Sequence, residues 1–264
     1  MRITKNTTAL VTGASGGIGQ AICRALHAAG AQLVVTGRRA ELLDALGAEL
    51  GARVVVADLA RRDDVQRCLD EVGSIDVLVA NAALPASGAL LDFPEAHIDR
   101  ALDVNLRAPL LMARYFARGM VERRRGQIVF VSSLSGIVAT PGTAVYSATK
   151  FGLRGAALGL RGDLHGTGVG VTTIFPGFIR DAGMFAESGI ALPAGVGTRS
   201  PEDVARAVLR AIARDPAEIT VAALSQRVGA VLAGLSQPLV AALVRMADGQ
   251  KRATAIAAKQ IDKR

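Results

Sequence analysis

Aromatic residues and cysteines are scarce in this 264-residue sequence, which contains no Trp, two Tyr, seven Phe and two Cys. With so little aromatic volume, a core has to be built from Ala, Val, Leu and Ile, which is typical of a buried parallel sheet covered by helices. Half of the residues are hydrophobic, so a sizeable core can be buried. The length suits one large domain better than two.

The two cysteines, Cys23 and Cys68, lie far apart, with no Cys-x-x-Cys pattern and no histidine pair beside them. This spacing argues against a disulfide framework or a zinc site and favours a reducing compartment. The first residues run straight into an apolar strand, which leaves no room for a signal peptide. We therefore expect a cytoplasmic protein without a bound metal ion.

Acidic residues are outnumbered by basic ones, and the formal net charge is +8. Such a balance suits nucleic acid, an anionic membrane or phosphorylated ligands. The sequence shows no nucleic-acid-binding motif and no aromatic-basic interleaving, so we expect no nucleic-acid partner. Most of the charge is expected to be solvated surface, with a few basic residues at cofactor phosphates.

Short apolar runs alternate with helical patterns along the chain. Strands are predicted at 9–11, 32–36, 53–57, 75–80, 127–132, 170–175 and 218–223, and helices at 17–29, 40–50, 61–71, 94–124, 144–165 and from 200 onward. The runs lack polar alternation, so both sheet faces should be covered. This order predicts an α/β fold, a Rossmann-type doubly wound parallel sheet of about seven strands that binds ligands beyond its carboxyl edge. Residues 178–200, rich in Gly and small residues, are predicted to be a mobile loop over the substrate.

A glycine-rich segment, Gly13–Gly19, follows the first strand and opens the first helix. Glycines let the backbone turn sharply and approach a diphosphate, while the helix N-terminus offers unpaired N–H groups to anions. Between a strand and a helix, such a segment predicts dinucleotide binding. The contacts are expected from Gly13, Ser15, Gly17, Ile18 and Gly19.

The end of the second strand indicates which dinucleotide is bound. Sites for NAD(H) usually place an acid there, but this strand ends in Gly37-Arg38-Arg39, with no acid before Glu41. An arginine attracts a ribose 2′-phosphate. We therefore predict NADP(H) rather than NAD(H), with Arg38 as the first candidate and Arg39 as the second.

Tyr146 and Lys150 are four residues apart in a predicted helix, so they share one face. An ammonium group near a phenol lowers the pKa of the phenol, as a general acid/base requires. Ser132 and Ser133 follow the fifth strand, where a hydroxyl could hold a substrate carbonyl oxygen. A Tyr-x-x-x-Lys match alone is weak, and its value comes from the other motifs in the correct order.

Together these motifs closely resemble the short-chain dehydrogenase/reductase family over about residues 7–223. The residues that carry the resemblance are Thr12–Gly19, Asp58, Asn81-Ala82, Asn105, Ser133, Tyr146, Lys150 and Pro176-Gly177. The resemblance implies that Ser133 orients the substrate carbonyl, Tyr146 transfers the proton, and Lys150 binds the nicotinamide ribose.

The resemblance also implies contacts around the cofactor. Asn105 would hold a water that links Lys150 to solvent, and Asp58 with Leu59 would meet the adenine. Asn81 and Ala82 would lie beside the cofactor, and so would Pro176 and Gly177, while the Ile179 backbone would contact the nicotinamide amide. The chain departs from the family at Ala80 and Ala83, where Asn and Gly are common, and at Asp181, where Thr is common.

Residues 224–264 extend beyond the predicted domain of residues 1–223. Val228–Val244 carries no charge but is short and contains Pro238, so we expect no membrane span. Residues 245–264 hold six Lys or Arg against two Asp. The extension could cover the substrate opening, form a subunit contact, or lie on an anionic membrane. The last strand and preceding helix form an interface in many tetramers of the family, and an extension starting there could block it, which favours a homodimer.

The sequence thus predicts an oxidoreductase that moves a hydride between NADP(H) and a carbonyl or secondary alcohol carbon of an apolar small molecule. The alternative is a dinucleotide-binding regulatory or scaffold protein without turnover. All four catalytic positions, Asn105, Ser133, Tyr146 and Lys150, are filled, which argues against that alternative.

Overall fold

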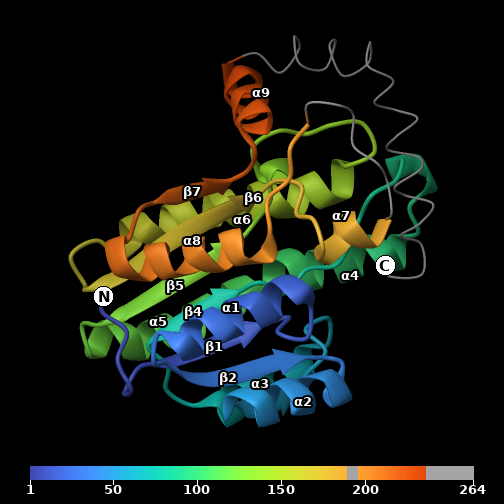
Figure 1. The fold of residues 1–264 in the computed structure, drawn as a ribbon. Coiled ribbons are helices and arrows are strands. Elements are labelled where there is room, and N and C mark those ends of the chain that lie inside the picture. The colour runs from blue at the N-terminus through green and yellow to red at the C-terminus, as the bar shows by residue number, and fades with distance from the viewer. Residues whose placement is uncertain (189–195, 236–264) are drawn as a thin grey trace.

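The computed structural model describes residues 1–188 and 196–235. Its centre is a seven-stranded sheet in the order β3-β2-β1-β4-β5-β6-β7, with every neighbouring pair parallel (Figure 1). The strands are β1 (Thr8–Thr12), β2 (Gln32–Gly37), β3 (Arg53–Val56), β4 (Val77–Ala80), β5 (Gly126–Val131), β6 (Val169–Pro176) and β7 (Glu218–Val221). The predicted doubly wound α/β fold is confirmed.

Helices cover both faces of the sheet. They are α1 (Gly17–Ala28), α2 (Ala40–Leu50), α3 (Arg62–Val72), α4 (Glu95–Leu102), α5 (Ala108–Glu122), α6 (Ala144–Asp163), α7 (Gly183–Ser188), α8 (Pro201–Arg214) and α9 (Leu224–Leu235). One buried cluster joins the sheet to α3, α5 and α6, and a second joins it to α1, α2 and α8. Two separate apolar layers therefore hold the sheet between them.

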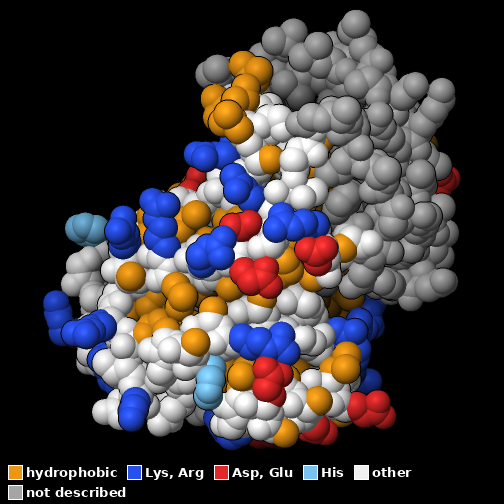
Figure 2. Space-filling model, in the orientation of Figure 1, with side chains coloured by type: hydrophobic (Ala, Val, Ile, Leu, Met, Phe, Trp, Pro, Cys, Tyr) orange, Lys and Arg blue, Asp and Glu red, His pale blue; other side chains and the backbone are white. Residues whose placement is uncertain are grey.

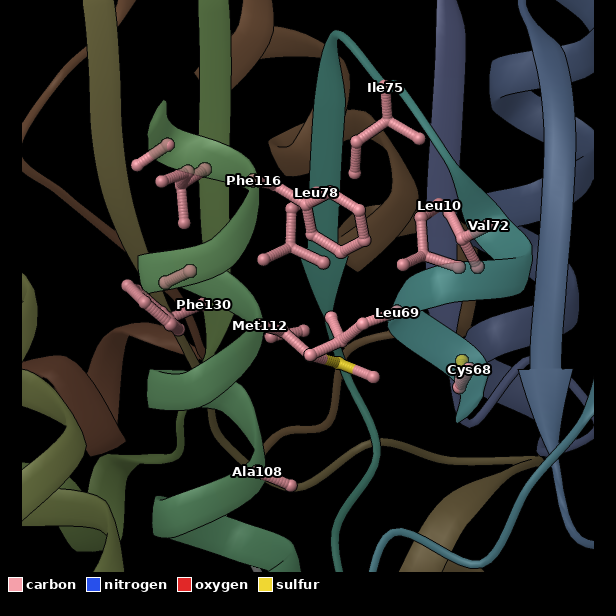
Figure 3. Packing of buried hydrophobic residues seen from close by; sticks show 14 of the residues in the cluster. Leu10, Cys68, Leu69, Val72, Ile75, Leu78, Ala108, Met112, Phe116 and Phe130 are labelled. Atoms are coloured by element: carbon pink, nitrogen blue, oxygen red, sulfur yellow. The ribbon is translucent and has the colours of Figure 1, made fainter. Parts of the chain in front are cut away.

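Strand residues alternate between these two layers, and both sets are apolar. Leu78 and Phe130 face α5, where Met112 and Phe116 pack against the same layer (Figure 3). Val79, which follows Leu78 in β4, faces the opposite layer. Because each side chain in the central strands is buried on one face or the other, the strands read as continuous apolar runs.

The long predicted helix at 94–124 is helical throughout but not uniform. A π-helical turn, Asp103–Arg107, separates α4 from α5. Such turns are rare and are often found at functional sites. The turn brings Asn105 into the buried interior, with 1 % of its surface exposed.

The predicted loop at 178–200 contains the short helix α7, and residues 189–195 of it lie outside the described part. The predicted start of the next helix is confirmed: Ser200 and Asp203 form a reciprocal capping box, and Pro201 is the first helical residue. After β7 the chain forms α9, which projects from the domain (Figure 1). Pro238, which argues against a membrane span in the sequence, lies outside the described residues. No described helix combines the length and apolarity needed to cross a bilayer.

Candidate active site

The glycine-rich turn joins β1 to α1 at the carboxyl edge of the sheet. Gly13 has a φ of +65°, which favours glycine, and a Cβ at this position would lie 2.8 Å from the Cα of Ala82. A Cβ on Gly19 would overlap the carbonyl oxygen of Gly13. Side chains at these positions would therefore close the turn, and the bare backbone leaves the N-terminus of α1 accessible to an anion.

Hydrogen bonds tie this turn to the next strand along the edge. The Thr12 hydroxyl accepts bonds from the backbone N–H groups of Asn81, at 3.0 Å, and Ala82, at 2.9 Å. The Asn81 side-chain amide donates to the carbonyl oxygens of Thr12, at 3.0 Å, and Gly13, at 3.3 Å. Asn81 and Ala82 thus hold the ends of β1 and β4 in register beside the turn.

The two arginines after β2 differ in their contacts. The Arg39 guanidinium reaches back to Ser15, donating to its carbonyl oxygen at 2.7 Å and to its hydroxyl at 3.3 Å. Arg38 is exposed and forms no hydrogen bond or ion pair with the described residues. Both lie next to the glycine-rich turn, and Arg38 has its full donor set available for a phosphate.

Asp58 and Leu59 follow β3 at the same edge. One carboxylate oxygen of Asp58 accepts a bond from the backbone N–H of Ala60, at 3.1 Å, and the other pairs with Arg100 of α4, at 3.0 Å. Leu59 is buried in the layer under α3 and α5. Asp58 therefore shapes the turn and links it to α4, and its contact with an adenine stays a prediction.

Tyr146, Lys150 and Ser133 come together where α6 crosses the end of β5. The Ser133 side chain lies close enough to the Tyr146 hydroxyl to lower the pKa of the phenol. The Lys150 ammonium is 5.6 Å from the centre of the Tyr146 ring and donates to the carbonyl oxygen of Val131 at 3.1 Å. The Ser132 hydroxyl instead donates to the backbone carbonyl of Lys150, at 3.2 Å, so Ser132 has a structural role and Ser133 faces the tyrosine.

Burial controls the acidity of this pair. It raises the pKa of Tyr146 to about 12, although the Ser133 side chain acts in the opposite direction. It also lowers the pKa of Lys150 from an ordinary 10.5 to about 8. The expected lowering of the Tyr146 pKa by the ammonium is therefore not found in this structure, where burial sets the direction of the shift.

Asn105 fastens the π-helical turn to the chain that leaves β4. Its side-chain oxygen accepts a bond from the backbone N–H of Leu84, at 2.6 Å, and its amide nitrogen donates to the Leu84 carbonyl, at 3.0 Å. The same nitrogen lies 3.4 Å from the hydroxyl of Thr149, the neighbour of Lys150. Asn105 thus holds the segment after β4 next to Thr149, the neighbour of Lys150. The water that Asn105 would bind stays a prediction.

The remaining predicted contacts lie at the end of β6. Pro176 is buried, and the Gly177 N–H donates to the carbonyl oxygen of Val221 at 2.9 Å. Ile179 is buried and forms a parallel bridge with Arg199, so the two ends of the loop lie side by side. This places the Ile179 backbone near the edge of the sheet where the other site residues gather.

Gln226 of α9 is a functional candidate that the motifs could not reveal. Its side-chain oxygen accepts a bond from the Phe178 N–H at 3.0 Å, and its nitrogen donates to the Gly197 carbonyl. One side chain from the C-terminal extension therefore holds both ends of the loop beside the site. No sequence signal pointed to it, since the contact joins segments far apart in the chain.

The residues at this edge fit a dinucleotide. The turn excludes side chains where a diphosphate would approach, and the Arg38 guanidinium is unpaired within the described structure. No group of three or more potential metal ligands occurs among the described residues. The arrangement can bind a dinucleotide and move a proton at the Tyr146 hydroxyl.

Lys150→Met tests the buried ammonium. Because folding lowers the pKa of Lys150 from 10.5 to about 8, the unfolded chain binds more protons between these values, and wild-type stability rises with pH across that window. At neutral pH the variant should be more stable than wild type by up to about 3 kcal/mol. That advantage should disappear as the pH approaches 10.5. Urea unfolding at several pH values measures the difference in free energy of unfolding, with exposed Lys5→Met as the control.

A difference between Lys150→Met and wild type that does not change with pH would contradict the lowered pKa of Lys150.

Comparison with known proteins agrees with this geometry. Residues 7–191 match the family model for short chain dehydrogenases. Nodulation protein G of Rhizobium sp. (strain N33) is 39 % identical over 180 residues, covering 66 % of this chain and 74 % of that protein. The 3-oxoacyl-[acyl-carrier-protein] reductase FabG of Rickettsia typhi is 34 % identical over 175 residues, covering 66 % and 73 %. A short-chain dehydrogenase from Sphingobium yanoikuyae, solved in complex with NADPH, superimposes with a TM-score of 0.74 at 28 % identity, covering 88 % of this chain and 96 % of that one. The chain therefore belongs to the short-chain dehydrogenase family and is an NAD(P)-dependent oxidoreductase.

Proposed function

We propose that the protein is an NADP(H)-dependent carbonyl reductase or alcohol dehydrogenase that acts on an apolar small molecule. The observation that carries the proposal is the Tyr146 side chain at the carboxyl edge of the sheet, with Ser133 close to its hydroxyl and the buried Lys150 beside its ring. The nicotinamide would supply or accept the hydride. Asn105, Ser133, Tyr146 and Lys150 would perform the remaining chemistry.

Proton transfer would run through Tyr146. With its pKa raised to about 12, the phenol is protonated at neutral pH, which suits a general acid that donates to the oxygen of a ketone. Ser133 would share the same oxygen and hold it within reach of the phenol. Lys150, poised near its pKa of about 8, would exchange a proton with the ribose side of the site.

An apolar substrate is supported by the surroundings of Tyr146. A small buried cluster, formed by Ala86, Phe93, Ala101 and Val145, packs against Tyr146 and Ile98. The cluster is buried, and it places apolar side chains next to the reacting tyrosine rather than groups that would pair with a charged substrate. The name of the FabG relative refers to a 3-oxoacyl group, and such a substrate would carry its carbonyl on an acyl chain.

NADP(H) is preferred to NAD(H) in this proposal because Arg38 is available for a 2′-phosphate and no acid stands at the end of β2. Arg39, which reaches Ser15, would be the second contact. The adenine would meet Asp58 and Leu59. The diphosphate would approach Gly13, Ser15, Gly17, Ile18 and Gly19, and the nicotinamide would lie near Asn81, Ala82, Pro176, Gly177 and Ile179.

The quaternary structure we propose is a homodimer. Helices α5 and α6 expose Tyr115, Phe151 and Leu158, at 39 %, 38 % and 45 % of their surface, and thus offer an apolar face for a second copy. The edge of the sheet at β7, together with α8, carries arginines that would repel their symmetry mates. We also infer a cytoplasmic protein, since both cysteines are free and buried. Recovery of the chain from a secreted fraction would contradict that inference.

Tyr146→Phe should lower kcat/KM for ketone reduction by roughly a hundred- to ten-thousand-fold, because the variant lacks the general acid. NADPH oxidation with a panel of ketones and aldehydes measures the change. Tyr115→Phe, which alters an exposed tyrosine, is the control and should retain activity. Equal rates in wild type and Tyr146→Phe would remove Tyr146 from the mechanism, and no turnover with any carbonyl would favour the regulatory alternative.

Arg38→Ala should lower kcat/KM for NADPH by roughly ten- to a hundredfold, since a charge-assisted contact to the 2′-phosphate is lost. The values for NADH should change little, because NADH has no such phosphate. Arg39→Ala, measured in parallel, separates the two arginines. A wild-type enzyme that prefers NADH would reject the assignment of the cofactor.

Sedimentation velocity should give a dimer for the wild type. Phe151→Glu with Leu158→Glu should yield monomers, because both changes place charge in the exposed apolar face of α6. A wild-type tetramer would contradict the homodimer, and a dimer that survives both substitutions would show that this face is not the interface.

A further inference from the structure

An arginine-lined hollow lies between α8, β7 and the start of α9, apart from the residues of the active site. It has a volume of about 240 Å³ and contains four arginines, Arg199, Arg206, Arg210 and Arg227. Its base is apolar, with Ala207, Ile219, Val221 and Ala222 among the lining residues. All four arginines are exposed.

Little acidic charge balances this hollow. Asp203 is the one acid among its lining residues, and it pairs with Arg206, beside which Glu202 also lies. Arg210 and Arg227 form no ion pair with the described residues. The hollow therefore presents uncompensated guanidinium groups, whose planar donor sets suit phosphate oxygens.

Helix α9 carries an apolar stripe next to the hollow. Leu224, Val228, Val231 and Leu232 are exposed over 72 %, 51 %, 65 % and 47 % of their surface. At 3.6 residues per turn they share one face of the helix. Gln226 and Ala230 occupy the other face, where Gln226 bonds to the loop and Ala230 is buried. These inner contacts hold the stripe outward.

The stripe and the hollow form one continuous surface. Arg227 belongs to α9 and lines the hollow, so it joins the two. In Figure 2 hydrophobic side chains gather over α9, and Lys and Arg side chains gather directly below them on the same face of the molecule. An exposed apolar helix face bordered by arginines is the pattern found in segments that lie in the headgroup region of a bilayer.

We propose that this surface, formed by the α9 stripe and the arginine-lined hollow, docks the protein on an anionic lipid bilayer. The stripe would enter the boundary between headgroups and acyl chains, and the arginines would meet lipid phosphates. The proposal does not depend on the identity of the substrate or cofactor.

Two other occupants are less consistent with the surface. In a two-fold contact between copies through this face, the arginines of one copy would confront those of the other, with like charges brought close together. An acidic protein would satisfy the arginines, but it would not account for four large apolar side chains exposed along one helix face. A bilayer with anionic headgroups supplies both partners at once.

Vesicle sedimentation tests the proposal. Wild-type protein is incubated with vesicles of phosphatidylcholine alone or of phosphatidylcholine with phosphatidylglycerol, and the partition coefficient is measured. Arg210→Gln with Arg227→Gln should lower binding to the anionic vesicles roughly 25-fold, about fivefold for each arginine. Val228→Gln with Val231→Gln should lower it by roughly tenfold or more.

A matched control removes the same charge elsewhere. Lys5→Gln with Arg62→Gln changes two exposed basic residues that form no ion pair with the described residues, and its binding should stay close to that of wild type. Thermal unfolding of every variant verifies that the fold is intact. The readout is binding, so it is independent of any enzymatic activity.

Binding to anionic but not neutral vesicles, lost in both test variants and kept in the control, supports the proposal. Equal binding to both kinds of vesicle, or an equal loss of binding in the control variant, would show that this surface does not recognise anionic headgroups. No vesicle binding, combined with binding to polyglutamate or with self-association that Arg210→Gln and Arg227→Gln strengthen, would replace the bilayer with an acidic protein or a second copy.

Discussion

Parallel pairing of the strands is the constraint on which the rest of the structure depends. Because every strand runs in the same direction, the chain leaves β1, β2, β4, β5 and β6 at one edge of the sheet. The glycine-rich turn, Asn81, Ser133 and Pro176 come from four different strands yet meet there. The two apolar layers make this arrangement rigid, since a register shift in any central strand would expose one layer and crowd the other.

The same rigidity allows an ionisable pair to be kept in the interior. Lys150 is 1 % exposed and is held by the carbonyl of Val131. Such a residue is unfavourable for folding at neutral pH, since its charged form is desolvated. Burial shifts the pKa of Tyr146 in the opposite direction, upward, so the phenol keeps its proton at neutral pH. The fold thus places a lysine with a lowered pKa close to a tyrosine with a raised pKa. This pair suits acid/base chemistry but does not stabilise the protein.

The C-terminal helix connects this chemistry to the surface of the molecule. Gln226 holds Phe178 and Gly197 at the two ends of the loop, while the far side of the same helix presents its apolar stripe. Arg227, one residue along, borders the arginine-lined hollow. Any partner that binds the stripe would therefore bind a helix that is tied directly to the loop after β6. The boundary between domain and extension at residue 224 is less sharp than the change in composition indicates.

The sequence by itself determined the class of fold, the order of strands and helices, the glycine-rich turn and the capped start of α8, because each depends on local pattern: apolar periodicity, glycine at φ above zero, or a reciprocal cap. It also determined the family, through short motifs whose order along the chain is specific. Only the tertiary structure decided that Ser133 rather than Ser132 faces Tyr146 and that Asn105 lies in a π-helical turn. It also decided that burial raises the pKa of Tyr146 and that Gln226 reaches the loop. Each of these depends on the distance between segments far apart in the chain and on how much water their contact excludes, and no local pattern records either quantity.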